Sequence, residues 1–257
     1  MARPRKRTIK RYGWVPDLPD QRDFAFRVPR RMVVSLPPRM DLRPQMPPVY
    51  DQGQLGSCTS NAIGGAFEFE LLKQSEPDFV PSRLFIYYNE RVIERTVDTD
   101  SGAQLRDGMK TLAKQGVCPE TMWPYVISQF ATEPSAACYT EAKRHLGVTY
   151  MRVEQEATQM RGCVAAGFPF IFGFTVYESF ESDAVTRTGN VPMPQGDERT
   201  LGGHAMCVVG YDNPKKLFIV RNSWGAGWGK NGYGTMPYAY FTNTDLSADF
   251  WTLRAVS

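Results

Sequence analysis

A chain of 257 residues can bury a substantial core, as one large domain or as two lobes. The composition, 42% hydrophobic and 22% charged, is ordinary for a soluble globular protein, and no apolar run approaches the roughly 20 residues that a transmembrane segment needs. The net charge of +3 becomes −3 when the six basic side chains of the first eleven residues are set aside, which excludes a strongly basic body.

Residues 1–35 combine basic residues and prolines with little periodicity, so we interpret them as an extended arm. The basic start is typical of a solvated tail or of an arm that binds an anionic surface. It lacks the interleaved aromatics and the long basic stripe of a nucleic-acid site, so no specific nucleic acid is expected. No signal-peptide core follows it, which leaves the location open between the cytoplasm and a non-classical export route.

Residues 50–62 place Gln52 six positions before Cys58, in a glycine-containing turn that leads into an apolar segment. A cysteine at a helix start feels the positive end of the macrodipole, which favours the thiolate. The Gln52 amide is placed to donate to an oxyanion forming beside that sulfur. The pattern predicts a nucleophile with its charge stabiliser. The alternative is a small buried cysteine that merely begins the helix.

Apolar residues recur at helical spacing in the first half of the chain after the arm, and the period changes in the second half. The predicted helices span 58–74, 81–95 and 104–115, the last closed by Gly116, and the predicted strands span 170–176, 205–211 and 217–220. Helices followed by an antiparallel sheet indicate an α+β chain. We expect a helical lobe at about 50–146, a β-rich lobe at about 147–257 and a cleft between them.

Two histidines are candidates for the base that a cysteine nucleophile needs. His145 lies in a charged stretch that is typical of a solvated helix end. His204 follows two glycines and opens a buried strand, where an imidazole can be held at the edge of a cleft. His204 is therefore the better candidate, and the alternative is a core histidine satisfied by its neighbours.

The two strands that follow His204 suggest an orienting partner for it. If they fold back around Asn213, residues whose numbers sum to 426 lie opposite each other, and His204 faces Asn222. The asparagine oxygen would then accept from the imidazole and fix the ring. A slip of one residue would turn the side chain to the other face, so this prediction depends on the register. Trp224 would either cover the contact or fill the core.

The remaining motifs favour no bound group. The glycine-rich run 225–234 leads into no helix, so we interpret it as a loop and not as a phosphate site. His204-x-x-Cys207 is the only metal-like spacing, and two groups on one strand make no zinc site, so no metal or cofactor is expected. Among the five cysteines, Cys118 and Cys138 are the best candidates for a disulfide, and Cys207 is expected in the core.

Three separated motifs together resemble the papain-like cysteine peptidases. They are Gln52-x5-Cys58, Gly203-His204-Ala205 leading into a strand, and the block Asn222-Ser223-Trp224-Gly225 with the glycines and tryptophan that follow it. His204 lies 146 positions after Cys58, inside the window of about 130–150 known for this family. The resemblance runs from about Leu36 to the C-terminus. The residues around Cys58 are similar to a bacterial branch with a short N-terminal arm.

This resemblance implies a papain-like two-lobe fold and a peptidase domain over residues 36–257 that needs no cofactor. It implies that Cys58 attacks a peptide carbonyl, that His204 exchanges the proton, that Asn222 orients His204 and that Gln52 helps to hold the oxyanion. The family usually has cysteine and tryptophan where this chain has Leu55 and Thr59. The disulfide made by that upstream cysteine is therefore absent, and the packing behind the nucleophile must differ.

The resemblance also nominates residues that would touch a peptide or protein substrate. These are Gly102 and Ala103 in a loop of the helical lobe, Gly173 at the wall of the main specificity pocket, and Gly203 and Trp224 beside the histidine and asparagine. At ~3.3 Å per residue, an extended arm of residues 1–35 can cross the cleft. We expect a thioester-forming endopeptidase whose arm is a short inhibitory propeptide, a cleft ligand that lowers activity until it is cut or displaced. The alternatives on the same fold are an acyl transferase and a non-hydrolytic peptide-binding module.

Overall fold

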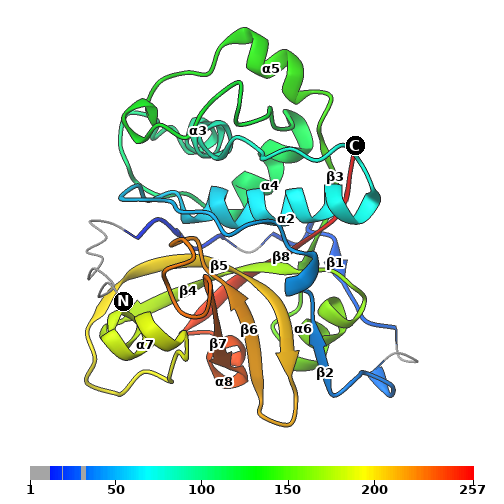
Figure 1. The fold of residues 1–257 in the computed structure, drawn as a ribbon, viewed down its shortest axis with the longest axis vertical. Helices are drawn as coiled ribbons and strands as arrows, with labels where there is room; N and C mark the ends of the chain where they lie inside the picture. The colour runs from blue at the N-terminus through cyan, green and yellow to red at the C-terminus, as the bar shows by residue number, and fades with distance from the viewer. Residues whose placement is uncertain (1–11, 19, 30–32) are drawn as a thin grey trace.

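The computed structural model describes residues 12–18, 20–29 and 33–257. A group of helices lies against one side of a large sheet (Figure 1). The helices of this group are α2 (Cys58–Gln74), α3 (Arg83–Glu94), α4 (Leu105–Lys114) and α5 (Ala136–Ala142). Helix α2 is the innermost of them, because it packs on α3 and α4 and also on the sheet.

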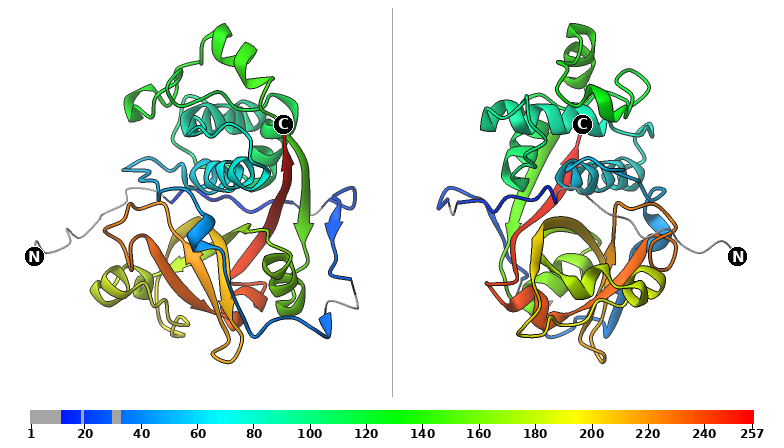
Figure 2. Two further views of the ribbon diagram at one scale, coloured as in Figure 1. Left: turned by 45° about the vertical axis from the view of Figure 1, so that its right-hand side comes forward. Right: turned by 90° about the vertical axis from the view of Figure 1, so that its left-hand side faces the viewer.

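The sheet is almost wholly antiparallel and comes largely from the second half of the chain. Its strands are β1 (Ala25–Phe26), β2 (Arg39–Asp41), β3 (Gly147–Val153), β4 (Phe170–Tyr177), β5 (Thr200–Asp212), β6 (Leu217–Arg221), β7 (Tyr233–Pro237) and β8 (Ser247–Val256). Among the described residues their order is β1-β3-β8-β4-β5-β6-β7, with β2 paired to β5, and β1–β3 is a parallel pair. Helices α6 (Ala157–Ala165), α7 (Asp183–Thr188) and α8 (Tyr238–Thr242) accompany the sheet (Figure 2).

The predicted α+β class and its principal elements are confirmed. Helix α3 begins after Ser82, whose hydroxyl accepts from the Phe85 N–H at 3.2 Å, a side-chain N-cap. Helix α4 ends before Gly116, which adopts φ +75° and whose N–H bonds back to the Leu112 carbonyl. Several of the elements that the pattern did not reveal, such as α5 and β1, are short and give little periodic signal, but the ten-residue, largely buried β8 was missed as well.

Helix α2 is buried on all sides over its first fourteen residues. A helix that is covered all round lacks a polar face, which is why its sequence is apolar through so much of its length. Even Glu68 and Glu70 are buried, and Glu68 accepts a hydrogen bond from the Tyr50 hydroxyl. This position between the other helices and the sheet brings Cys58, the first residue of α2, to the junction of the two regions.

The β5–β6 hairpin has a different register from the one that the sequence suggested. Cys207 pairs with Arg221 and Val208 with Val220, and the register then shifts before the next pair. The prediction that paired numbers sum to 426 is therefore wrong, because the turn spans residues 213–216 and is not centred on Asn213, so the pairs beside it sum to 429; a bulge at Val209 then changes the sum to 428. Asn222 lies just past β6, where the predicted position of the residue was correct although the pairing was not.

The five cysteines are all buried and free, so the best candidate pair for a disulfide, Cys118 and Cys138, is not bridged. Their thiols are near enough to interact, and Cys138 lies 3.3 Å from the Ser135 hydroxyl. Cys207 lies in the core as expected, with 1% of its surface exposed. In the part of the chain that the structure describes, no helix is long and apolar enough to span a membrane. Within the same part, no cluster of three or more metal-binding side chains occurs.

Candidate active site

Cys58 follows a tight turn that is anchored by one carboxylate. The Gly56 N–H donates to both oxygens of Asp100, at 3.0 and 3.1 Å. The Tyr87 hydroxyl donates to the same carboxylate at 2.6 Å. Asp100 opens loop 100–103, which contains two of the predicted substrate-binding residues. One side chain therefore fixes this loop to the turn that presents the sulfur.

The Gln52 side chain is held rigidly beside this turn. Its Nε2 donates to the Leu55 carbonyl at 2.9 Å, and its Oε1 accepts from the Ser223 hydroxyl at 2.6 Å. The Gln52 N–H also donates to the Ser223 carbonyl at 2.8 Å, which joins the turn to the far side of the site. An amide nitrogen carries two hydrogens, so the bond to Leu55 leaves the second for another acceptor.

His204 and Asn222 meet as the sequence predicted. His204 Nε2 lies 2.9 Å from Asn222 Oδ1, and His204 has no exposed surface. The same oxygen accepts from the Ser223 N–H at 2.8 Å, which fixes the plane of the amide. Because the asparagine oxygen is an acceptor, Nε2 is assigned as the protonated ring nitrogen. The asparagine therefore sets both the tautomer and the direction of the ring.

Aromatic side chains surround this polar contact. The ring centroid of His204 lies 5.1 Å from that of Trp224, 5.6 Å from Phe174 and 6.1 Å from both Phe180 and Tyr12. The indole of Trp224 is itself buried, with 7% of its surface exposed. A ring of apolar groups keeps water from the histidine–asparagine bond, and a hydrogen bond in such surroundings is stronger than one in water.

A chain segment from the N-terminus runs between the helices and the sheet (Figure 1). The Gly13 carbonyl accepts from the Ala103 N–H at 2.7 Å, and the Val15 N–H donates to the Ala103 carbonyl at 3.0 Å. On the other side, the Trp14 N–H donates to the Gly203 carbonyl at 3.0 Å. Main-chain bonds therefore hold this segment to both regions at once.

The predicted substrate-binding glycines are the residues that this segment touches. A Cβ atom on Gly173 would lie 1.9 Å from the Trp14 indole, and one on Gly203 would lie 2.7 Å from it. At Gly102, where φ is +76°, a Cβ would lie 2.3 Å from the Gly13 carbonyl oxygen. The missing side chains create the space that the Trp14 ring and the adjoining backbone fill.

The Cys58 sulfur lies beneath this segment and is completely buried. Burial raises the pKa of Cys58 to about 12, although the N–H groups of Ala205 and Gly13 point at the sulfur and lower the pKa in part. The helix start alone predicts a lowered pKa, and in the covered site that expectation is wrong. Desolvation disfavours the thiolate more strongly than the neighbouring dipoles favour it.

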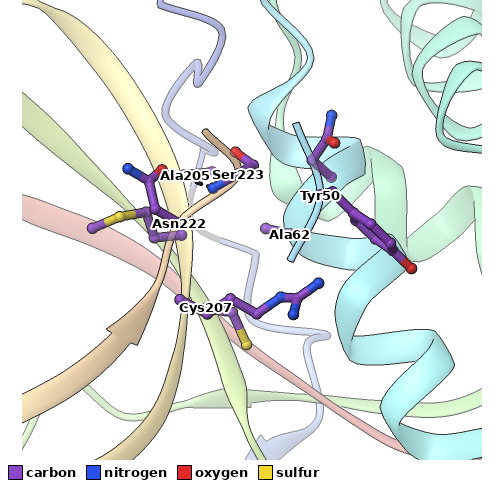
Figure 3. A pocket seen from close by; sticks show the side chains of 9 residues that line it. Tyr50, Ala62, Ala205, Cys207, Asn222 and Ser223 are labelled. Carbon is purple, nitrogen blue, oxygen red and sulfur yellow. Dashed lines mark hydrogen bonds between the residues drawn. The ribbon is translucent and has the colours of Figure 1, made fainter. Parts of the chain in front are cut away.

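A small cavity lies behind the catalytic face, where α2 meets β5 (Figure 3). Its volume is about 10 Å³, close to that of one water molecule and too small for any substrate side chain. The residues labelled in Figure 3 come from both sides of the junction: Tyr50 and Ala62 from the helical side, and Ala205, Cys207, Asn222 and Ser223 from the sheet side. The space that admits a side chain is instead the one filled by Trp14.

Three residues of this arrangement escaped the sequence analysis: Asp100, Ser223 and Trp14. Asp100 is an acid two positions before a predicted substrate-binding glycine, and Ser223 lies inside the asparagine block, so both carried a local signal. Trp14 is the one tryptophan of the arm, but the arm holds other apolar residues, such as Leu18 and Phe24, that are exposed, so its sequence alone did not mark Trp14 as buried. In the structure only 8% of its surface is exposed.

Comparison with known proteins identifies the family to which the chain is similar. A model of the papain family cysteine proteases matches residues 36–247. The chain belongs to this family. An uncharacterized peptidase C1-like protein of Acanthamoeba polyphaga mimivirus is 42% identical over 276 residues, which cover 97% of this chain and 89% of that protein.

Solved structures agree with the assignment. Xylellain, a cysteine protease from Xylella fastidiosa, has 42% sequence identity and a TM-score of 0.92 over 98% of both chains. Digestive procathepsin L 3 from Tenebrio molitor, 22% identical with a TM-score of 0.65 over 86% of this chain and 70% of that one, shares the fold. The protein is thus a papain-like cysteine peptidase with the two-region fold of its relatives.

The structure shows how Leu55 and Thr59, the two departures from the family pattern, are packed in this peptidase. Leu55 is buried in a small apolar cluster with Leu84, Tyr87 and Ala103, so packing replaces a covalent link at that position. The Thr59 hydroxyl donates to the carboxylate of Glu90 at 2.8 Å. Burial raises the pKa of Glu90 well above its ordinary range, so a protonated acid behind Cys58 fits this apolar site.

Proposed function

We propose that this papain-family peptidase hydrolyses peptide bonds with Cys58 as nucleophile, His204 as acid and base, and Asn222 as the residue that orients His204. The observation that carries the proposal is the 2.9 Å contact between His204 Nε2 and Asn222 Oδ1, on the strand whose next N–H, that of Ala205, points at the Cys58 sulfur. The bond to asparagine leaves Nδ1 as the ring nitrogen that exchanges a proton with the sulfur.

The reaction proceeds in two displacements. Cys58 transfers its proton to His204 and attacks the substrate carbonyl, and the resulting oxyanion accepts from the Cys58 N–H and the second Gln52 amide hydrogen. As the C–N bond breaks, His204 protonates the leaving amine and a thioester remains. His204 then takes a proton from water, whose oxygen attacks the thioester. The carboxylic acid leaves, and the sulfur regains its proton from His204.

Alkylation by iodoacetamide at a series of pH values tests the activated pair, with mass spectrometry identifying the labelled cysteine. A variant that displaces the arm, Gly13→Ala, is the starting protein, so that the reagent reaches the sulfur. We expect fast labelling of Cys58 well below pH 8, and slow labelling when His204→Ala is added. The other four buried cysteines serve as internal controls. An unchanged pH profile after His204→Ala would contradict the assignment.

We further propose that the N-terminal arm inhibits the enzyme by occupying its cleft. The Gly13 N–H is directed at the Cys58 sulfur, so the arm offers the nucleophile a hydrogen-bond donor where a substrate would offer a carbonyl carbon. A segment bound in this way covers the site without being cleaved there. Gly13 permits the close approach, because a Cβ at that position would lie 1.6 Å from the Gly56 carbonyl oxygen.

The Gly13→Ala variant therefore tests inhibition by the arm. Overlap of the added methyl with the Gly56 backbone should displace the arm and raise the turnover of a small peptide. Gly196→Ala is the matched control, because a Cβ there meets no atom within 4 Å. Truncation near Leu36 is a poorer test, since it also removes β1 and the buried Val28. Equal turnover by Gly13→Ala, Gly196→Ala and the natural chain would contradict inhibition.

We infer endopeptidase activity from the path of the same segment. It passes over the sulfur and continues in both chain directions, with Tyr12 beside His204 and Trp224, and Val15 beside Ala103. A cleft that is open at both ends accepts an uninterrupted chain. Digestion of a peptide blocked at both termini should give internal fragments. Products that carry an added amine in place of a free carboxylate would instead indicate acyl transfer.

A further inference from the structure

Asp249 is a buried carboxylate at the end of the space that Trp14 fills. It lies in β8 at a register shift against β4, and its φ of +57° places it in the left-handed region. A bulge in this conformation turns a side chain out of the regular alternation of a strand. Only 1% of Asp249 is exposed, so its oxygens depend on the hydrogen-bond donors around them.

The two oxygens of Asp249 face different parts of the molecule. Oδ1 accepts from Arg152 at 3.1 Å, within the body of the peptidase. Oδ2 accepts from the Trp14 indole N–H at 3.1 Å and from the Asp17 backbone N–H at 2.7 Å. Both of these Oδ2 donors belong to the arm. When the arm leaves, Oδ2 loses them and faces the vacated space.

We propose that Asp249 is a specificity-determining residue of this peptidase and that it selects a tryptophan side chain in the substrate. The proposal rests on the proposed function, in which the arm and a substrate compete for one cleft. Gly173 and Gly203 provide a flat, narrow space that fits an indole, and Asp249 provides an acceptor at the rim where the indole N–H lies. Phenylalanine fits the space but leaves the acceptor unpaired.

The surrounding charges argue against a lysine or arginine in this space. Asp17 and Asp23 of the arm lie near Arg106 and Arg152 of the body, with N···O separations of 3.6 Å from Arg152 and 3.7 Å between Arg106 and Asp17. When the arm leaves, both of its carboxylates leave as well. Arg152 then remains paired with Asp249, and Arg106 remains over the same Trp251 ring as Arg152, so a further cation would meet like charge. A neutral N–H donor meets no such repulsion.

The test compares two peptides that differ in one group. Each is a blocked fluorogenic dipeptide ending in glycine, which adds no second side chain, and the preceding residue is tryptophan or its isostere 3-benzothienylalanine, which lacks the N–H. The arm competes equally with both peptides, so their ratio of kcat/KM is independent of how tightly the arm binds. We expect the natural full-length chain to prefer tryptophan by roughly tenfold or more.

Three variants test whether Asp249 causes the preference for tryptophan. Asp249→Gly removes the acceptor and accepts a positive φ, so the ratio should fall to about one. Asp249→Asn keeps a weaker, neutral acceptor and should give an intermediate ratio. Asp17→Asn removes a charge from the arm without altering the space, so absolute rates should change while the ratio stays as in the natural chain. A thermal melt of each variant confirms folding.

The outcomes separate this inference from the proposed function. A ratio near one in the natural chain, or a ratio that Asp249→Gly leaves unchanged, would overturn the selection of tryptophan while peptide cleavage stands. Absence of turnover with both peptides, even in Gly13→Ala, would instead contradict the peptidase proposal. In that case the ratio of dissociation constants of the two peptides, measured by fluorescence anisotropy, tests Asp249 by the same criteria.

Discussion

The proposed catalytic groups and the arm that covers them are held by different kinds of contact. Gln52, His204 and Asn222 are fixed through their side chains, by bonds of 2.6 to 2.9 Å to partners within the body. The arm is fixed beside the sulfur mostly through its main chain, with Gly13 having no side chain at all. A side-chain hydrogen bond depends on the type of residue, whereas a main-chain hydrogen bond requires only that no side chain blocks the close approach. Substitutions in the two regions should therefore change activity in opposite directions.

The largest effect is expected at the nucleophile. Cys58→Ala removes the attacking sulfur, so peptide turnover should fall to background, as measured with a fluorogenic peptide. Cys207→Ala is the matched control, because burial raises the pKa of both thiols to about 12. The control should keep most of its activity at a modest cost in stability. Turnover retained in Cys58→Ala would contradict the assignment of Cys58 as the nucleophile.

Gln52→Ala should lower kcat by about 10²–10³, the loss typical of one oxyanion donor. Ser223→Ala separates this donor from its support, because it removes the hydroxyl that bonds Gln52 Oε1 and leaves the amide hydrogens in place. We expect a smaller loss there, about tenfold or less. Steady-state kinetics with one peptide checks both variants. Equal losses would indicate that Gln52 acts by holding the turn and not through its N–H.

The same contrast explains how far the sequence could lead. Gln52, Cys58, His204 and Asn222 were found because each sits in a motif where residue type carries the chemistry. The His204–Asn222 contact was anticipated from a wrong register, since the turn spans residues 213–216 and is not centred on Asn213, and a bulge at Val209 changes the pairing by one more residue. A bulge is a backbone event that no side-chain alternation reveals.

Other parts of the site had no sequence signal of this kind. Asp249 belongs to a strand that the pattern did not predict, and its role depends on a positive φ. Asp100 accepts from the backbone N–H of Gly56, 44 positions away. Whether Trp14 reaches Gly173 depends on the path of the whole arm. Contacts of this sort are properties of the folded chain, and they become visible only with coordinates.

On the arm, Trp14→Ala should raise activity. The substitution removes a buried indole together with its bond to Asp249, so the bound arm loses affinity and kcat/KM for a small peptide should rise, by up to about 100-fold. Leu18→Ala is the control on the same segment, because 81% of Leu18 is exposed. Its kinetics should match those of the natural chain. A fall in activity in Trp14→Ala would show that the arm supports the cleft and does not block it.

The smallest effect concerns pH. Burial, and secondarily the charge of Asp249, raises the pKa of Asp17 to about 7, and the groups facing it are Asp23, Asp249, Glu94, Arg106 and Arg152. A pKa raised in the bound arm means that the bound arm holds this proton more tightly than the free arm does. Binding of the arm is then strongest below about pH 4, where a free aspartate is protonated too, and weakens as the pH rises through about 7.

Dividing the activity of the natural chain by the activity of Trp14→Ala isolates the pH dependence of arm binding, since titration of the catalytic groups is common to both proteins. It should rise a few-fold per pH unit between about pH 5 and pH 7. Asp17→Asn, compared in the same way, should flatten the rise because it removes the titrating group. A ratio that falls with rising pH would mean that the ion pairs with Arg106 and Arg152 outweigh burial, and that the ionised carboxylate, not the protonated one, holds the arm in place.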